Sequence, residues 1–412
     1  MEFNKYRLKE LAKYKNERIN TNQLTTSNYI STENLLPNKQ GKQKANKLPS
    51  SKTVKKYTET DILISNIRPY FKKIWQADNI GGISNDVLNI TSSNEKISND
   101  YLYYYLSQDK FFQYMTQTSK GTKMPRGDKE AIMEFEIQVP KNVKYQNFIS
   151  NLGKFLDNKI EINNKIIANL EELSQTLFKH WFVDFEFPDE DGNPYKSSGG
   201  EMIDSELGKI PKGWIVKSLD EIANYINGLA MQKYPANKEE SLPIVKIKEL
   251  KNGFTDDNSN RCTTEIPEKA KIDNGDIIFS WSATLLVKMW TGGKAGLNQH
   301  LFKVTSETFP KWFYYLWTKR YIEYFINIAN DKATTMGHIN RKHLSHAKVV
   351  LPTQLQLENF DKIFHNLLDK QLNTEEELKR LIDLRDTLLP KLMSGELEIP
   401  DDIEVNTDEL SI

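Results

Sequence analysis

Polar, basic and aromatic side chains follow two similar hydrophobic runs, Asp61-Ile62-Leu63-Ile64-Ser65 and Asp276-Ile277-Ile278-Phe279-Ser280, and recur in two later loops. Lysine and arginine neutralise phosphates, whereas arginine, asparagine, glutamine and histidine can read base edges in the major groove. The pattern therefore favours binding to double-stranded DNA, although drift of unconstrained surface residues would give a similar pattern. In the first half of the chain the candidate DNA-binding residues are Asn66, Arg68, Tyr70, Lys72, Lys73, Lys120, Thr122, Lys123 and Arg126. In the second half they are Trp281, Ser282, Lys288, Asn298, Gln299, His300, Lys332, Thr334, Thr335, His338, Asn340 and Arg341.

Catalytic motifs are not found in the sequence. There is no G-x-x-x-x-G-K-[ST], H-E-x-x-H, C-x-x-C or G-x-S-x-G pattern. Two glycine pairs, Gly81-Gly82 and Gly292-Gly293, are better explained as turn glycines than as phosphate-binding loops. The histidines at 338, 343 and 346 have no carboxylate or cysteine at the spacing that would complete a closed metal site. We therefore expect no catalytic residue, no bound cofactor and no metal in this chain.

The chain contains a long internal repeat. Lys120-Gly121-Thr122-Lys123-Met124 reappears 212 residues later as Lys332-Ala333-Thr334-Thr335-Met336. The same spacing relates Pro140 to Pro352 and Leu177 to Leu389, and it drifts by a few residues across loops. Such a long period is not that of a solenoid. It indicates a whole domain followed by a helix, used twice, and suggests a partner that is itself in two parts.

Each repeat predicts a mixed globular domain. Short runs of branched and aromatic residues, broken by Gly, Asn and Asp, indicate strands. An aromatic helix is predicted at 101–115 and again at 312–328, and each is followed by a polar loop and a short strand ending in proline, at 137–140 and 349–352. The polar loop is the part that we expect to be available for binding.

After each proline, apolar residues recur at three- and four-residue steps, which predicts a long helix. The first spans about ten turns with one glycine, Gly153, and no proline. A helix with an apolar seam needs a partner, and the two are best paired antiparallel, since the first must return the chain to a second domain. The alternative is two helices that each dock on their own domain. The predicted fold class is α+β, with two pseudo-repeated mixed α/β target-recognition domains separated by two long antiparallel α-helices.

These patterns predict six segments along the chain. They are a first recognition domain at 1–144, a long helix at 145–183, an acidic Gly/Pro/Ser surface connection at 184–213, a second recognition domain at 214–353, a second long helix at 354–397, and an acidic tail at 398–412.

Composition agrees with an intracellular, nucleic-acid-binding protein. The 412 residues carry zero formal net charge, yet 184–206 and 396–412 are strongly acidic, which leaves the remainder basic. Residues 42–73 are the densest basic stretch, although the lysines of 42–56 alone are also explained as an ordinary solvated charge run. One cysteine, Cys262, fits a reducing compartment. No signal-like or membrane-spanning apolar run is found, so we expect a soluble, cytoplasmic protein without a membrane partner.

Two segments resemble the conserved regions of type I restriction-modification specificity subunits. The segment LEELSQTLFKHWFVDFEFP at 170–188, continued by SELGKIPKGW at 205–214, resembles the central conserved region, and LRDTLLPKLMSGEL at 384–397 resembles the distal one. The resemblance covers the entire chain in the order variable domain, conserved helix, variable domain, conserved helix.

The resemblance implies a non-catalytic subunit in which each recognition domain reads one half of a bipartite DNA site. It also implies two modification subunits, which bring S-adenosylmethionine and methylate adenine, and restriction subunits, which bring ATP, Mg and nuclease chemistry. The helix pair would set the spacer between the half-sites and dock the modification subunits. Candidate docking residues are Trp181, Phe182, Phe185 and Phe187, for which a hydrophobic cap on the helix end is the alternative. The competing functions are a self-contained methyltransferase or nuclease and a helical adaptor that binds no nucleic acid.

Overall fold

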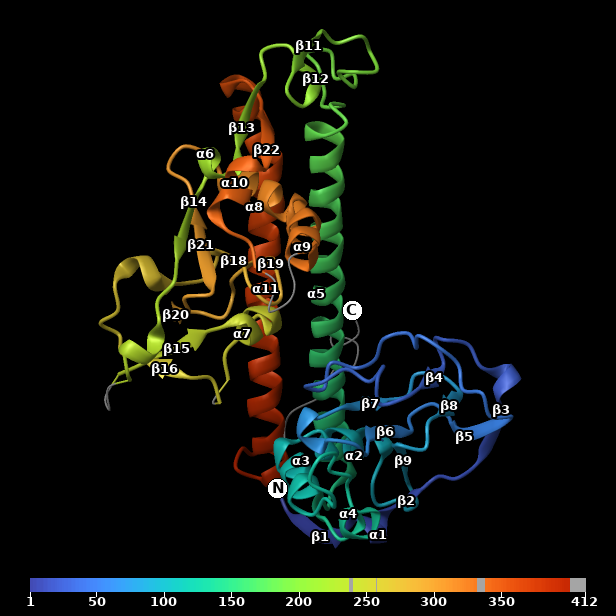
Figure 1. The fold of residues 1–412 in the computed structure, drawn as a ribbon. Helices are drawn as coiled ribbons and strands as arrows, with labels where there is room; N and C mark the ends of the chain where they lie inside the picture. The colour runs from blue at the N-terminus through green and yellow to red at the C-terminus, as the bar shows by residue number, and fades with distance from the viewer. Residues whose placement is uncertain (237–239, 257, 332–337, 401–412) are drawn as a thin grey trace. The chain divides into compact units, whose positions relative to one another are not determined.

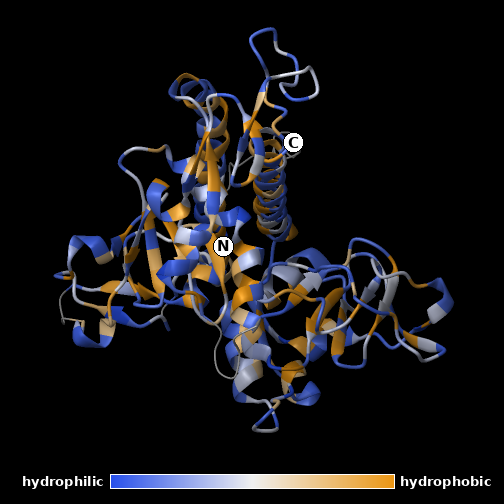
Figure 2. Cartoon of the chain, turned by 45° about the horizontal axis from the view of Figure 1, so that its top comes forward, coloured by the Kyte–Doolittle hydropathy of each residue, from blue (hydrophilic) through white to orange (hydrophobic). Residues whose placement is uncertain are grey.

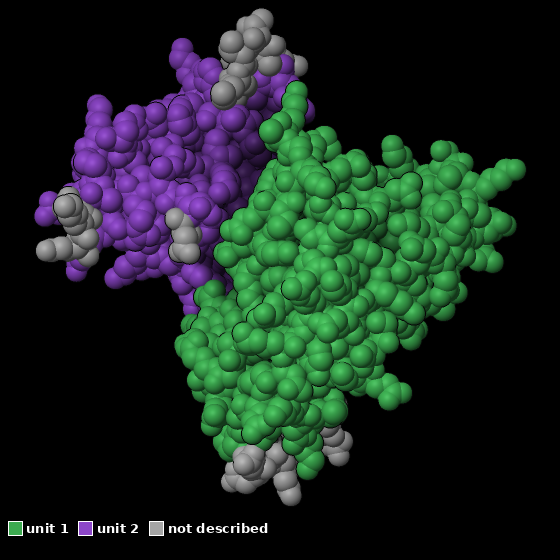
Figure 3. Space-filling model, turned by 90° about the horizontal axis from the view of Figure 1, so that it is seen from below, with its two compact units in different colours: residues 1–160, 380–412 green, residues 161–379 purple. Residues whose placement is uncertain are grey.

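The computed structural model describes residues 1–236, 240–256, 258–331 and 338–400. The chain forms two compact units, one of Met1–Ile160 with Arg380–Ile412 and one of Glu161–Lys379 (Figure 3). Two long helices each contribute a segment to both units. Strands and helices are rich in hydrophobic residues, whereas many of the connecting loops are hydrophilic (Figure 2).

Among its described residues, the first unit contains three small sheets and four short α-helices (Figure 1). One four-stranded sheet has the order β2-β9-β6-β7, formed by Ala12–Tyr14, Val87–Ser92, Ile62–Ser65 and Ile74–Gln76. The other has the order β3-β5-β8-β4, formed by Arg18–Asn20, Thr53–Tyr57, Gly81–Ile83 and Tyr29–Ile30. β1 (Phe3–Arg7) pairs antiparallel with β10 (Glu136–Pro140). The α-helices are α1 (Leu8–Leu11), α2 (Asn99–Leu106), α3 (Asp109–Gln117) and α4 (Lys129–Met133).

The second unit repeats this plan. Its sheets have the orders β14-β21-β18-β19, formed by Asn224–Asn227, Leu301–Thr305, Ile277–Ser280 and Leu286–Met289, and β16-β15-β20-β17, formed by Arg261–Cys262, Leu242–Val245, Ala295–Leu297 and Lys271–Ile272. β13 (Ile215–Ser218) pairs with β22 (Lys348–Leu351) as β1 pairs with β10. The short helices are α6 (Leu219–Ile222), α7 (Ile247–Asn252), α8 (Lys311–Arg320), α9 (Ile322–Asp331) and α10 (Arg341–His346).

The repeated Asp-Ile motif builds the same turn in both units. The Asp61 carboxylate accepts the backbone N–H of Thr58 at 2.8 Å, and the Asp276 carboxylate accepts that of Asp273 at 2.9 Å. A lysine then neutralises each aspartate, Lys15 at 3.2 Å and Lys303 at 2.8 Å. These turns start the fully buried strands β6 and β18, which lie inside their sheets between two partners. The predicted repeat of mixed domains is thus confirmed.

The two predicted aromatic helices are each broken into two. α2 ends at Leu106, and Gln108 is extended before α3 begins, whereas α8 and α9 are separated only at Tyr321. At this break the Tyr103 carbonyl accepts from both the Ser107 amide at 2.9 Å and the Ser107 hydroxyl at 2.7 Å.

The long helices are α5 (Val143–Phe182) and α11 (Gln354–Ser394). α11 ends where Gly395 adopts a φ of +76°, a left-handed conformation that glycine accepts without a steric penalty. After α5, the equivalent positive φ of 63° falls on Phe185. Both ends are closed by a backbone bond over six residues, from Leu397 to Lys391 at 3.1 Å and from Glu186 to His180 at 2.9 Å.

In the second unit the two helices run antiparallel. Phe178 of α5 contacts Phe364 of α11 with ring centroids 6.2 Å apart, and Trp181, further along α5, contacts Phe360, earlier in α11, at 4.8 Å. The predicted antiparallel pairing is therefore confirmed there. In the first unit, Asp157 of α5 bonds Arg385 of α11 at 2.8 Å.

The glycine pair Gly81-Gly82 does not form a turn, contrary to our prediction. Both glycines lie in β8, and Gly296 occupies the middle of the corresponding strand β20. A Cβ on Gly82 would lie 2.5 Å from Val54, and one on Gly296 would lie 2.8 Å from the Cys262 sulfur. Close packing against the neighbouring side chains, not a turn, therefore requires glycine at these two positions.

The acidic connection is partly core, which corrects the expectation of a purely surface segment. It contains the hairpin β11 (Met202–Ser205) and β12 (Gly208–Pro211), and its Phe187 and Ile210 are buried. Among the described residues, no helix has the length and apolar character needed to cross a membrane.

Candidate nucleic-acid interface

In the first unit the fold brings two of the predicted polar segments together, residues 66–73 and 120–127, which we call the first loop pair. The amide of Gly127 donates to the Asn66 carbonyl at 3.0 Å, and the amide of Arg68 donates to the Pro125 carbonyl at 2.8 Å. An antiparallel bridge joins Ile67 to Arg126 between these bonds. The two segments are separated by 46 residues in sequence, yet they form one surface beyond the end of β6.

The backbone of segment 66–73 is held in an unusual conformation. Arg68 and Lys72 both adopt positive φ, at 51° and 52°, on either side of the 3₁₀ turn η2 (Pro69–Phe71). Non-glycine residues in this region persist where surrounding structure fixes them, and they cluster at ligand-binding sites. Tyr70 and Phe71 are 48% and 40% exposed, which leaves two aromatic rings beside the exposed Arg68 side chain. Phe71 is not among the residues predicted from the sequence, although it lies next to the predicted Tyr70.

Four predicted side chains of segment 120–127 are exposed: those of Lys120, Thr122, Lys123 and Arg126. Arg126 pairs with Asp86 at 3.2 Å, and Lys120 pairs with Asp128 at 2.5 Å. Such exposed ion pairs contribute little to stability, so a phosphate can replace the carboxylate at small cost. This segment has the properties that a DNA-contacting surface requires.

Two predicted residues of segment 66–73 point elsewhere. Asn66 is 8% exposed, and its Oδ1 is buried beside Gly127, where a Cβ would lie 2.8 Å from it. The Lys73 ammonium donates to the Thr32 carbonyl at 2.5 Å, and burial lowers the pKa of this group. Asn66 is thus buried, whereas Lys73 is partly buried with its ammonium directed at Thr32. Contacts of these two residues to DNA stay a prediction.

The second unit builds the same arrangement, which we call the second loop pair, from residues 281–284 and 338–341. The amide of Ile339 donates to the Trp281 carbonyl at 3.1 Å, as Gly127 donates to Asn66, and Ser282 bridges His338 as Ile67 bridges Arg126. The preceding serines also match. The hydroxyl of Ser65 donates to the carbonyl two residues later at 3.1 Å, and that of Ser280 does so at 3.3 Å.

Aromatic and basic side chains gather at the second loop pair. The Trp281 ring lies 5.9 Å from the His300 ring and 6.4 Å from the His338 ring. His300 belongs to the turn 298–300 between β20 and β21, where its amide donates to the Asn298 side chain at 3.3 Å and its ring contacts Gln299 at 3.3 Å. The structure therefore adds this predicted turn to the loop pair.

Arg341 and Asn340 complete the second loop pair. Arg341 begins α10, and its guanidinium donates to the Tyr225 carbonyl at 3.0 Å and lies over the Phe302 ring at 5.8 Å. The side chains of Asn340 and Arg341 are both exposed. These contacts hold the Arg341 guanidinium in place, while part of the side chain remains exposed to solvent.

The remaining predicted residues are not part of this cluster. Lys288 lies on β19, with its ammonium near Gly253. Lys332, Thr334 and Thr335 lie outside the described residues. Across the described ranges, no three His, Cys, Asp or Glu side chains are grouped so that they would hold a metal ion.

Three of the four predicted docking residues are core residues. Trp181, Phe182 and Phe187 are 7%, 1% and 1% exposed. The rings of Phe187 and Trp214 stack at 4.9 Å, and Phe182 contacts Trp312 at 5.8 Å. They form the hydrophobic cap of the helix end, which was the alternative interpretation. Phe185 is only partly buried and contacts Trp214 at 5.8 Å.

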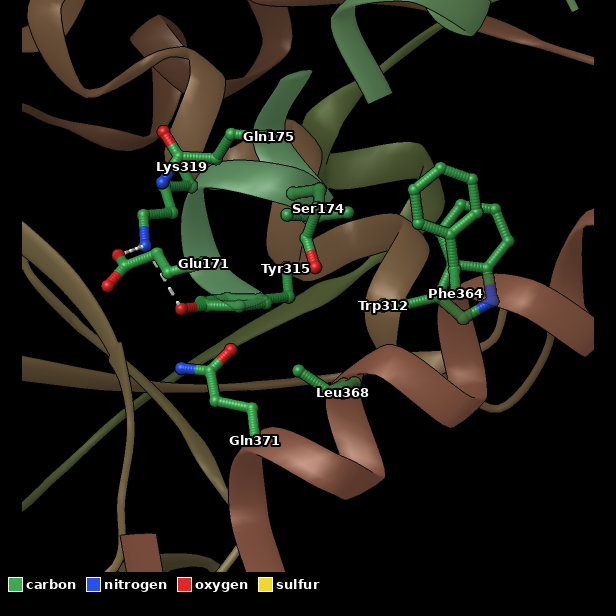
Figure 4. Close-up of a pocket in the computed structure, with 10 residues that line it drawn as sticks. Glu171, Ser174, Gln175, Trp312, Tyr315, Lys319, Phe364, Leu368 and Gln371 are labelled. Carbon is green, nitrogen blue, oxygen red and sulfur yellow. Dashed lines mark hydrogen bonds and ion pairs between the residues drawn. The ribbon is translucent and has the colours of Figure 1, made fainter. Parts of the chain in front are cut away.

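In each unit an aromatic helix docks the recognition domain on the long helices. In the second unit, Lys319 of α8 forms an ion pair with Glu171 of α5 and contacts the Tyr315 hydroxyl at 3.3 Å (Figure 4). The hollow between these side chains measures about 10 Å³, which is the space of one water molecule. In the first unit, the hydroxyl of Tyr104 in α2 donates to Asp157 of α5 at 2.9 Å. These contacts fix each loop pair relative to the helix segment of its own unit.

Comparison with known protein families agrees with this architecture. The family of the type I restriction modification DNA specificity domain matches residues 1–172 and 211–383. Each match covers one globular domain with most of the long helix that follows it. This chain belongs to that family. Its class of protein is the type I restriction-modification specificity subunit.

Individual relatives are distant. The specificity subunit of the type I restriction enzyme MjaIX from Methanocaldococcus jannaschii is 26% identical, over 74% of this chain and 70% of the relative. The specificity subunit of HindI from Haemophilus influenzae is 24% identical, over 82% and 86%. A crystal structure of a type I restriction-modification S subunit from M. genitalium superposes with a TM-score of 0.57 at 16% identity over 97% of both chains, which supports the fold.

Proposed function

We propose that each loop pair reads one half of a bipartite DNA site, so that this chain selects the sequence on which a type I complex acts. The observation that carries the proposal is the repeated backbone link, Gly127 to Asn66 and Ile339 to Trp281. The link gives both loop pairs the same backbone arrangement, while the side chains that they carry differ. A shared scaffold with different polar tips suits the reading of two different half-sequences.

The chemistry is expected on partner subunits. Two modification subunits would bring S-adenosylmethionine and methylate adenine, and restriction subunits would bring ATP, Mg and cleavage. This chain would contribute sequence selection and the placement of those subunits, without catalytic residues of its own.

The docking surface for the modification subunits needs exposed side chains, so the buried aromatic cap is a poor candidate. Leu173 of α5 and Leu384 of α11 are 50% and 48% exposed, and both lie in the segments that resemble the conserved regions. Exposed apolar residues on a helix are suited to burial by a protein partner. We therefore assign docking to the faces that carry these two leucines.

Reconstitution with a modification subunit tests the proposal. The chain alone should transfer no methyl group from S-adenosylmethionine to DNA, whereas the complex should methylate sites that share two fixed half-sequences with an unread spacer. Methyl transfer by the purified chain alone would favour a self-contained enzyme. Salt-dependent DNA binding by the complex would count against a helical adaptor that binds no nucleic acid, because each phosphate contact adds to the salt dependence.

A further inference from the structure

Lys39 occupies an unusual place beside the first loop pair. Its side chain is 10% exposed, and its ammonium lies between two carboxylates, 3.3 Å from Asp109 of α3 and 3.1 Å from Asp386 of α11. All of these residues belong to the first unit. A charge that is largely removed from water must keep its partners, because an unpaired buried charge is strongly destabilising. Lys39 therefore cannot move away from α11 without a large penalty.

The backbone around Lys39 holds segment 66–73. The amide of Lys39 donates to the Lys72 carbonyl at 2.9 Å, and the amide of Asn38 donates to the Phe71 carbonyl at 2.9 Å. Asn38 and Lys39 have positive φ values of 54° and 61°. Four non-glycine residues in left-handed conformation, these two with Arg68 and Lys72, thus lie in two segments that bond to each other.

The side chains make a second link between the same elements. Lys72 donates to the other oxygen of Asp109 at 2.7 Å, so that Asp109 joins the two lysines. On the far side of Lys39, the Arg385 guanidinium bonds Asp386 at 3.0 Å and Asp157 at 2.8 Å. A continuous alternation of charges therefore runs from both long helices to segment 66–73. It borders a hollow of about 210 Å³.

We propose that Lys39 is a positioning residue for recognition of the half-site read by the first loop pair. The proposal rests on the function proposed above. Base discrimination requires that reading groups be held to about half an ångström, and segment 66–73 is a loop that needs external support to reach such precision. Lys39 supplies that support by joining the loop backbone to Asp386 on α11. The link makes the helix segment of the first unit the reference frame for its recognition loop.

The experiment compares Lys39→Met, Lys39→Arg and Asp386→Asn in the complex with modification subunits. Methylation is measured on DNA libraries degenerate in either half-site. Lys39→Met and Asp386→Asn should lower discrimination by about tenfold in the half-site that is altered by Lys123→Ala with Arg126→Ala, and leave the other half-site as in wild type. Lys39→Arg keeps the charge and should restore much of the discrimination. Lys5→Met removes an equal charge from an exposed pair with Glu136 and should change neither half-site.

The outcomes separate this proposal from the broader one. If the wild-type complex shows no bipartite site, the proposed function fails. If the wild-type site is bipartite but Asp386→Asn, a change at a partly exposed helix position, retains full discrimination in both halves, the role of Lys39 is refuted. Equal relaxation of both half-sites by Lys39→Met would also refute it, because a general loss of stability would then explain the effect.

Discussion

Asp157 of α5 and Arg385 of α11 form an ion pair of 2.8 Å within the first unit, and the guanidinium is only 11% exposed. The Tyr104 hydroxyl donates to the other carboxylate oxygen at 2.9 Å. One carboxylate thus joins both long helices to the aromatic helix α2. The pair therefore holds the first recognition domain on its helix segment.

Removal of Asp157 should destabilise the first unit. Asp157→Ala leaves the Arg385 guanidinium with Asp386 alone in a largely buried place, and we expect a loss of about 2 kcal/mol in the free energy of unfolding. The measurement is the midpoint of urea denaturation, compared between variants whose unfolding free energy has the same dependence on urea concentration. Lys5→Met, which breaks an exposed pair, should change stability by less than about 1 kcal/mol. Equal effects of the two substitutions would show that burial of the pair is unimportant.

Gly153 in α5 should resist replacement by alanine. Alanine favours an exposed helix by about 1 kcal/mol over glycine. Here a Cβ would lie 2.5 Å from the Tyr104 ring, so Gly153→Ala should instead lower stability by about 1 to 3 kcal/mol. Asn164→Ala, at an exposed position of the same helix, is the control and should be neutral or slightly stabilising. A more stable Gly153→Ala protein would contradict the close packing of α2 on α5.

Joint replacement of Asn298, Gln299 and His300 by alanine should affect one half-site only. These residues form the turn beside Trp281 in the second loop pair, and loss of one good bidentate base contact costs about 1 to 3 kcal/mol of discrimination. Methylation mapping with the complex should show a relaxed second half-sequence. Lys123→Ala with Arg126→Ala should relax the other half. If either variant altered both halves, the modular assignment would be wrong.

The length of the helix pair should set the spacer between the half-sites. The 40 residues of α5 span about 60 Å at 1.5 Å per residue. Four residues inserted after Ile160 and after Lys379, at the unit boundaries, add slightly more than one helical turn, so the apolar faces stay roughly aligned. The added length of about 6 Å is close to two base-pair steps. We expect the same half-sequences with a longer spacer in methylation maps.

A two-residue insertion at the same sites serves as the control for the spacer. It rotates the later residues by about 200° and should abolish methylation, because the apolar faces no longer match. An active four-residue variant that methylated only the original spacer would show that the helices do not set the distance.

The sequence by itself determined that a mixed domain followed by a long helix occurs twice, because both elements follow from local patterns of apolar residues. The sequence predicts the long helices at 145–183 and 354–397, and they are found at Val143–Phe182 and Gln354–Ser394, since apolar residues at helical spacing specify a helix. Strands β6 and β18 were equally evident from matched hydrophobic runs. The formation of each of these elements depends on residues that are close to one another in sequence.

Only the tertiary structure decided which polar residues share a surface. The link of Asn66 to Gly127 joins residues far apart in sequence, and no local pattern encodes that pairing. The same holds for Lys39, whose role depends on Asp386 at the other end of the chain. Trp181, Phe182 and Phe187 could be read from sequence as either a docking surface or a cap, because an apolar residue type does not say which neighbour covers it. Packing against α8 and α11 settled that choice, since burial is a property of the folded chain.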